Sequence, residues 1–217
     1  VADAVKALGP WISDWEILNE TNTPRFWIRT PSAREYMDLL VPTGKLIRSL
    51  APGARVMLGS LCGNDVSYLA PVVRRHYLRE LLALGAMEHA DLVGFHPYTG
   101  DCYVSLKGEG GTARGVEQGI ARFFDAYPEL ADRTWITEIG ISRGLVRLGH
   151  REIGRVYARW IRGAAERGVP VYLWCLQDFD DPEYGPLNPE RTFGLAGVDL
   201  RINETGLALI EALGLSS

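Results

Sequence analysis

Two glutamates follow short apolar runs in this chain. Glu20 comes directly after an amide, Asn19, at the end of residues 15–20, and Glu138 ends residues 134–138 in a similar way. A carboxylate at the mouth of a buried strand is costly unless water, a partner or a substrate receives it. We therefore interpret the two segments as strand ends that present two catalytic glutamates.

Two carboxyl groups across one pocket are what the cleavage of a glycosidic bond requires. One acid protonates the leaving oxygen, while the other carboxylate attacks the sugar or activates water. In a retaining enzyme the two groups lie about 5 Å apart, and this closeness raises the pKa of one of them so that it stays protonated. The ordinary alternative is a pair of exposed loop glutamates. The apolar runs and the aromatic side chains around both positions favour catalysis.

Strands and helices alternate in the predicted secondary structure. Apolar runs predict five strands, at residues 11–18, 55–59, 91–96, 134–137 and 169–174. Helical spacing predicts a helix tail at residues 1–8, helices that begin at Ser32, Ser67, Thr112 and His150, and a last helix at residues 205–213. Strict alternation implies an α/β fold with a parallel sheet, either doubly wound or a barrel.

Two loops bear on the choice of function. The first strand-to-helix turn, residues 19–24, has no glycine that would let a phosphate approach, which disfavours a doubly wound nucleotide-binding domain. The loop at residues 99–111 ends in the glycine-rich stretch 108–111, which lacks the ending of a phosphate loop. We interpret this stretch as a flexible loop, and a lid over a cleft is its functional alternative.

Composition excludes several classes of function. The 217 residues are 47% hydrophobic, enough for one large core, so we expect a single domain over residues 1–217. The net charge is −4 and no Lys/Arg cluster is interleaved with aromatic residues, which argues against a nucleic-acid partner. No apolar run approaches the roughly 18 residues of a membrane helix, so no membrane partner is expected. The chain begins with Val, so we expect an upstream part to have been removed, and localisation stays open.

The metal-ligating residue types are sparse. Cys62, Cys102 and Cys175 are odd in number and form no CxxC pair, so we predict three inert thiols, with a Cys62–Cys102 bridge as the alternative. The four histidines form no HxH or HExxH pair, and no metal is predicted. No motif implies a cofactor.

Four landmarks together resemble the glycoside hydrolases of clan A, in a style close to families 5 and 39. They are Asn19-Glu20, His96-Pro97-Tyr98, Glu138 within Trp-Ile-Thr-Glu-Ile-Gly, and Trp174. Each motif is weak alone, but the four occur in the expected order and at plausible spacing.

The resemblance implies a role for each landmark. Glu20 resembles the acid/base and Asn19 the amide that binds the 2-hydroxyl of the sugar, while Glu138 resembles the nucleophile of a retaining enzyme. His96 and Tyr98 belong to a segment whose tyrosine hydroxyl lies near the nucleophile. Trp174 resembles the tryptophan that floors the sugar subsite. Among the other aromatic residues near the strand ends, Trp27 is a second candidate for stacking on a sugar.

The resemblance also implies the fold and the substrate class. The fold would be a (β/α)8 TIM barrel in which the five strands are strands 4 to 8, so strands 1 to 3 would come from an upstream segment or a second chain. The substrate would be an oligosaccharide, polysaccharide or glycoside, with β-linkages favoured. The alternative function is a non-catalytic carbohydrate-binding or scaffold protein that keeps the cleft of a glycosidase barrel.

Overall fold

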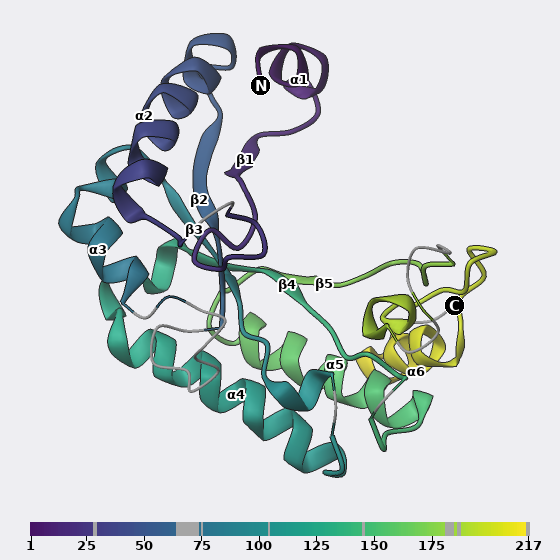
Figure 1. Ribbon diagram of the computed structural model, residues 1–217. Helices are drawn as coiled ribbons and strands as arrows, with labels where there is room; N and C mark the ends of the chain where they lie inside the picture. Colours follow the sequence, from purple (N-terminus) through teal and green to yellow (C-terminus); the bar gives the residue numbers. More distant parts are fainter. Residues whose placement is uncertain are drawn as a thin grey trace. The chain divides into compact units, whose positions relative to one another are not determined.

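A computed structural model describes residues 1–27, 30–63, 74, 76–103, 105–144, 146–180, 185 and 188–215. Five strands form one sheet in chain order, as labelled in Figure 1: β1 (Asp14–Ile17), β2 (Arg55–Cys62), β3 (Leu92–His96), β4 (Thr134–Ile139) and β5 (Val171–Leu173). The pairs β1–β2, β2–β3 and β4–β5 are parallel. Sequential order, parallel pairing and intervening helices make this a partial barrel of the TIM type, as the clan A resemblance implied.

The described part of the chain has six α-helices beside these strands. They are α1 (Ala2–Leu8), α2 (Ala33–Leu50), α3 (Tyr77–Ala83), α4 (Glu109–Ala126), α5 (His150–Ala165) and α6 (Glu204–Leu213). Short 3-10 helices occur at Ala86–Glu88, Gly100–Cys102, Pro128–Arg133 and Pro189–Thr192. Helix α2 begins where predicted, because the Ser32 hydroxyl accepts the Glu35 backbone N–H at 3.3 Å. The start predicted at Ser67 lies outside the described residues.

Several predicted boundaries were wrong. Strand β1 begins at Asp14 rather than at residue 11, since Trp11 is 86% exposed and has no place in a core strand. Strand β2 runs three residues beyond Gly59, and β4 extends past residue 137 to include Glu138. Helix α4 starts at Glu109, so most of the stretch 108–111 is helical rather than a loop. Its first residue, Glu109, suits a helix N-terminus and accepts a hydrogen bond from Arg155 at 2.8 Å.

The chain forms two compact units. The first comprises Val1–His96 and Arg122–Trp135, and the second comprises Pro97–Ala121 and Ile136–Ser217. In the first unit, β2 and β3 are almost wholly buried, and β2 packs against α2, whose inner face is formed by Tyr36, Leu40 and Ile47. The ring of Phe95 in β3 stacks on Phe123 with centroids 4.3 Å apart. This apolar packing holds the carboxyl ends of β1, β2 and β3 in place.

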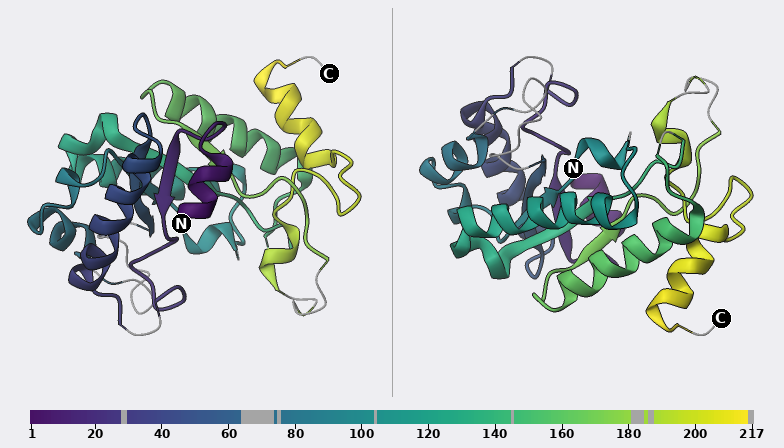
Figure 2. Two further views of the ribbon diagram at one scale, coloured as in Figure 1. Left: turned by 90° about the horizontal axis from the view of Figure 1, so that it is seen from above. Right: turned by 90° about the horizontal axis from the view of Figure 1, so that it is seen from below.

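The core of the second unit is built on helix α5. This helix is strongly amphipathic, and its buried face carries Ile153, Val156, Tyr157 and Trp160. Helix α6 lies against α5 (Figure 2), and Gly154 makes the close approach possible. A methyl group added at Gly154 would lie 2.7 Å from the Ala208 Cβ and 2.8 Å from the Leu209 backbone nitrogen.

No helix among the described residues is long and apolar enough to cross a membrane.

Replacing Gly154 by Ala should destabilise the protein. The added methyl group meets α6 backbone that cannot move aside, so we expect the free energy of unfolding to fall by about 1–3 kcal/mol, the usual range for overpacking. Gly163→Ala in the same helix is the control, because nothing lies within 4 Å of the added group. That change should raise the free energy of unfolding by up to about 1 kcal/mol through helix propensity. Urea unfolding of both variants checks this, and equal effects would contradict the packing argument.

Candidate functional site

The segment after β1 carries Asn19 and Glu20 over the end of β2. Leu18 and Glu20 have φ angles of 69° and 43°, in the left-handed region that side chains other than glycine rarely adopt. The Ser60 hydroxyl accepts the Glu20 backbone N–H at 3.1 Å, and the Ser60 carbonyl accepts that of Thr21 at 3.0 Å. Contacts with β2 therefore hold the strained turn.

A buried tyrosine fixes the start of this turn. The Tyr36 hydroxyl, on α2, donates to the Ile17 carbonyl at 3.0 Å and accepts the Gly59 N–H at 2.7 Å. Burial raises the pKa of Tyr36 far above its ordinary value, so the hydroxyl keeps its proton and both bonds. One side chain thus joins α2, β1 and β2 beside Asn19 and Glu20.

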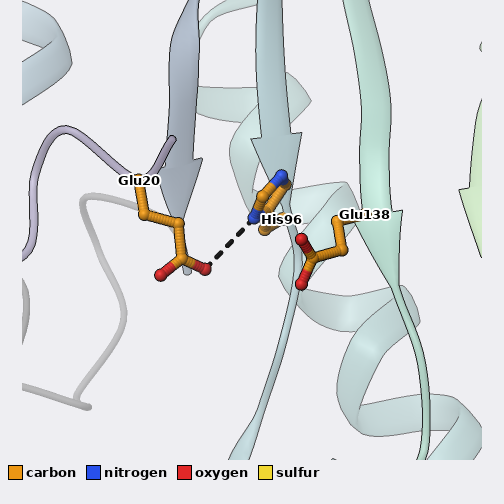
Figure 3. Close-up of side chains that lie close together, drawn as sticks. All are labelled: Glu20, His96 and Glu138. Carbon is orange, nitrogen blue, oxygen red and sulfur yellow. Dashed lines mark hydrogen bonds and ion pairs between the residues drawn. The ribbon is translucent and has the colours of Figure 1, made fainter. Parts of the chain in front are cut away.

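Glu20 is buried and lies against His96, the last residue of β3. Its side-chain oxygen Oε1 is 3.1 Å from the His96 Nδ1, as the dashed line in Figure 3 marks. Glu20 is 8% exposed and His96 is 1% exposed. An imidazole nitrogen can donate to a carboxylate or accept from a carboxylic acid. The pair can therefore hold the Glu20 carboxyl group in one orientation whether it is ionised or protonated.

Glu138 in β4 is held by Tyr98 within the second unit. The Tyr98 hydroxyl donates to the Glu138 Oε1 at 2.9 Å, which is the tyrosine contact that the sequence resemblance implied. Tyr98 is 4% exposed and packs against Tyr103 and Phe193, with ring centroids 5.4 and 6.3 Å away. Burial and the neighbouring charge of Glu138 raise the pKa of Tyr98 well above its usual value. Tyr98 is therefore a lasting hydrogen-bond donor to this carboxylate.

The two candidate tryptophans have different surroundings. Trp174 follows β5, is half-buried, and has its ring centroid 5.9 Å from that of Phe179. The peptide bond between Trp174 and Cys175 is cis. Trp27 lies beside the start of α2, where its Nε1 donates to Glu35 at 3.2 Å and its ring meets Tyr36 edge-on. Among the described residues, the hydrogen bonds that hold Asn19 and Glu20 come from Ser60 and His96 and not from Trp27.

An ion pair joins the loops that follow β4 and β5. Arg143 pairs with Asp178, and both side chains are less than one-fifth exposed. Asp178 also accepts the Gly194 N–H at 2.8 Å, while Arg143 donates to the Gly194 carbonyl at 2.5 Å. These bonds fix the loop after Trp174 to the loop after Glu138.

The cysteines are thiols, as predicted, and the alternative of a bridge between Cys62 and Cys102 was wrong. Burial raises the pKa of Cys102 to about 11 and that of Cys175 to about 11. Both therefore stay protonated near neutral pH and are unreactive, since the thiolate is the nucleophile.

The sequence interpretation missed the residues that hold the catalytic candidates. Ser60 and Tyr36 were not singled out, nor was Asn22, whose side chain makes two hydrogen bonds to the Cys62 backbone, at 2.9 and 3.1 Å. Ser60 had a signal, because it is the one polar residue inside the apolar run 56–62. A hydroxyl in a buried strand calls for partners, and here those partners are Asn19 and Glu20.

Removing the charge of Glu138 should lower the pKa of Tyr98. The Glu138→Gln change deletes the negative charge beside the phenol, while burial keeps the pKa above its ordinary value. Tyrosine-labelled NMR titration measures this, with the Tyr98→Phe variant assigning the signal. Tyr157 is the internal control, because burial raises its pKa and Glu138 is not among its charged neighbours. This account would be contradicted if Tyr98 titrated near pH 10, or if its pKa were the same in the wild type and in Glu138→Gln.

Comparison with known proteins supports the fold. No protein-family model and no curated protein matches the chain. Among solved structures, a family 39 glycoside hydrolase from Bacteroides cellulosilyticus WH2 is 20% identical with a TM-score of 0.65, over 98% of this chain and 43% of that one. A GH5_18 protein from Streptomyces cattleya is 16% identical with a TM-score of 0.70, over 98% of this chain and 51% of that one.

A beta-glucuronidase from Faecalibacterium prausnitzii resembles this chain about as much as the two structures above do. It is 20% identical with a TM-score of 0.66, over 99% of this chain and 34% of that one. At such identities the likeness concerns the fold. The chain spans about half of these structures or less, and it has the fold of part of a glycoside hydrolase barrel, in agreement with the clan A resemblance of its motifs.

Proposed function

We propose that the protein is a glycoside hydrolase that cleaves β-linked O-glycosidic bonds with retention, using Glu138 as nucleophile and Glu20 as acid/base. The observation that carries the proposal is a pair of carboxylates in a glycosidase-type fold, one in the turn after β1 and one in β4, each held by a buried hydrogen-bonding side chain. His96 holds Glu20 and Tyr98 holds Glu138. Polar side chains at the carboxyl ends of barrel strands more often take part in catalysis than in stabilising the fold.

The two partners suit the two roles. Tyr98 is a permanent donor, and donation to a carboxylate favours the ionised form that a nucleophile needs. His96 can either donate or accept at Nδ1, which suits a carboxyl group that gives up and regains a proton in every turnover. This difference supports Glu138 as the nucleophile and Glu20 as the acid/base.

Sheet topology supports a shared substrate. The strands form one sheet in the order β1 to β5, and parallel strands end at the same edge. Glu20 follows β1, and Glu138 is the penultimate residue of β4. We propose that the two carboxyl groups act on one glycosidic bond, in the two roles that a retaining enzyme requires.

The reaction would proceed in two displacements. A carboxylate oxygen of Glu138 forms a bond to the anomeric carbon as the glycosidic C–O bond breaks, and the proton of Glu20 passes to the leaving oxygen. Water then attacks the same carbon, Glu20 takes the proton of that water, and the bond to Glu138 breaks. Asn19 would hydrogen-bond the 2-hydroxyl, and this bond strengthens as positive charge develops on the sugar. Trp174 would stack on the sugar ring, and Trp27 is the weaker candidate for such stacking.

The names of the structural neighbours support a β-linked substrate. They include a beta-glucuronidase, an exo-beta-1,4-mannosidase and a beta-1,3-glucanosyltransferase. We therefore propose an oligosaccharide, polysaccharide or glycoside with β-linkages. Because the matched structures extend well beyond the region shared with this chain, we also propose that an upstream segment or a second chain supplies the remaining barrel strands.

A mechanism-based label tests the nucleophile. A 2-deoxy-2-fluoroglycoside with a reactive leaving group should add its sugar to Glu138, as read by peptide mass spectrometry, and Glu138→Gln should abolish both labelling and turnover. Proton NMR of the first product should show the anomeric configuration of the substrate. A protein that binds sugars but is never labelled would instead be the non-catalytic carbohydrate-binding protein considered as the alternative.

The acid/base role makes a different prediction. Glu20→Gln should lower the rate on a substrate with a poor leaving group by about 10²- to 10⁴-fold, the usual contribution of general acid catalysis. A dinitrophenyl glycoside needs no proton on its leaving group, so its first step should be much less affected. Azide should then restore turnover and give a glycosyl azide with the substrate's configuration. Glu166→Gln, at an exposed glutamate, is the control. Equal losses on both substrates would contradict the role of Glu20.

A further inference from the structure

The polar groups of Ser60 all bind residues 16–21, in β1 and in the turn that carries Asn19 and Glu20. Its side chain is wholly buried in β2. Its backbone N–H donates to the Glu16 carboxylate at 2.7 Å, and its carbonyl accepts from Thr21 at 3.0 Å. Its hydroxyl accepts the Glu20 N–H at 3.1 Å and donates to the Asn19 Oδ1 at 3.0 Å. A buried serine would be costly without partners, and here every group has one.

A register shift in β2 lets the backbone of Gly59 and Ser60 bind the β1 side instead of β3. The pairing of β2 with β3 shifts register between Leu58 and Leu61, so the backbone of the two residues between them can turn to β1. Gly59 also has no room for a side chain, because an added methyl group would lie 2.7 Å from the Thr21 Cγ2 and 2.8 Å from the Leu18 carbonyl. Gly59 and Ser60 therefore form a floor directly beneath the turn.

The hydroxyl of Ser60 determines which way the Asn19 amide faces. A hydroxyl has a single proton, and one lone pair of this oxygen already receives the Glu20 N–H. If the Asn19 amide were reversed, its NH2 group would face the hydroxyl and the buried hydroxyl proton would lose its acceptor. The arrangement with Oδ1 toward Ser60 satisfies both groups, and it leaves the Asn19 Nδ2 as the atom that can donate to a ligand.

We propose that Ser60 is a positioning residue that fixes the Asn19 amide so that its N–H groups face the 2-hydroxyl oxygen of the sugar. This rests on the proposed function, in which Asn19 binds that hydroxyl. The left-handed backbone at Leu18 and Glu20, on both sides of Asn19, needs such external support. Ser60 supplies it by binding the Glu20 backbone and the Asn19 side chain with one oxygen. The site would thus select sugars whose second carbon carries a hydrogen-bond acceptor.

The test compares aryl glycosides with and without the 2-hydroxyl. Ser60→Ala should reduce the ratio of kcat/KM for the 2-hydroxy substrate to that for its 2-deoxy analogue by about tenfold, the size expected for one hydrogen bond. Asn19→Ala should reduce the same ratio, and the double variant should show no further loss, because both changes remove one interaction. Ser60→Thr keeps the hydroxyl and should restore the ratio at least in part. A Ser60→Ala variant that slows both substrates equally would overturn the proposal.

A matched control separates positioning from stability. Ser142 is also wholly buried, and its hydroxyl donates to the Pro189 carbonyl at 2.9 Å. Ser142→Ala should lower the unfolding temperature about as much as Ser60→Ala but leave the substrate ratio unchanged. A ratio that falls equally in both variants would show that loss of stability, rather than the Asn19 amide, is responsible.

A measurement without any sugar keeps this proposal distinct from the proposed function. The side-chain NH2 signals of Asn19 in a nitrogen–proton NMR spectrum should be well dispersed in the wild type. In Ser60→Ala they should move toward the values of an unrestrained amide, while Ser142→Ala should leave them in place. Unchanged signals in Ser60→Ala would overturn the positioning role. A protein that hydrolyses no glycoside but shows this shift would overturn the glycosidase proposal alone.

Discussion

The hydrogen bonds between the end of β2 and the turn after β1 are the constraint on which the first unit depends. The turn has two residues in the left-handed region, Leu18 and Glu20, and buries a carboxyl group. Both features are unfavourable by themselves. Tyr36 and Ser60 offset the first by binding the backbone on either side of Asn19, and His96 offsets the second by its contact with the Glu20 carboxyl group. Helix α2 and strand β2 are therefore supports for the candidate acid as well as parts of the core.

In the second unit, polar side chains near strand ends are also held by buried partners, but the groups involved are different. Glu138 receives a hydrogen bond from the buried Tyr98, and the loops beyond β4 and β5 are joined through Arg143 and Asp178. A charged pair that is less than one-fifth exposed is costly unless its geometry and added hydrogen bonds compensate, and both side chains also bind Gly194. The same principle thus operates in both units: a polar group near a strand end is fixed by buried partners far away in the sequence.

Apolar periodicity and helix-capping residues were sufficient to predict the order of the strands and helices. The buried runs in β2, β3 and β4 and the Ser32 cap of α2 are local signals, and local signals survive folding. Boundaries were less predictable. The extension of β2 through Ser60 depends on a bond to Glu20, 40 positions away, and the helical start at Glu109 depends on one to Arg155, 46 positions away. Such partners are invisible to a local pattern.

The sequence by itself determined the alternating α/β fold and singled out Asn19, Glu20, Tyr98, Glu138 and Trp174. Their residue types, their places near strand ends and the motifs that resemble clan A are all local facts. Only the tertiary structure decided how these side chains are held. Tyr98 meets Glu138 across 40 positions, and His96 meets Glu20 across 76. It also separated Trp27, bound to Glu35, from the hydrogen bonds around Glu20, and it gave Ser60 its place beneath Asn19. The physical reason is that a buried polar group must have a hydrogen-bond partner, whereas the packing of strands far apart in the sequence decides which group that partner is.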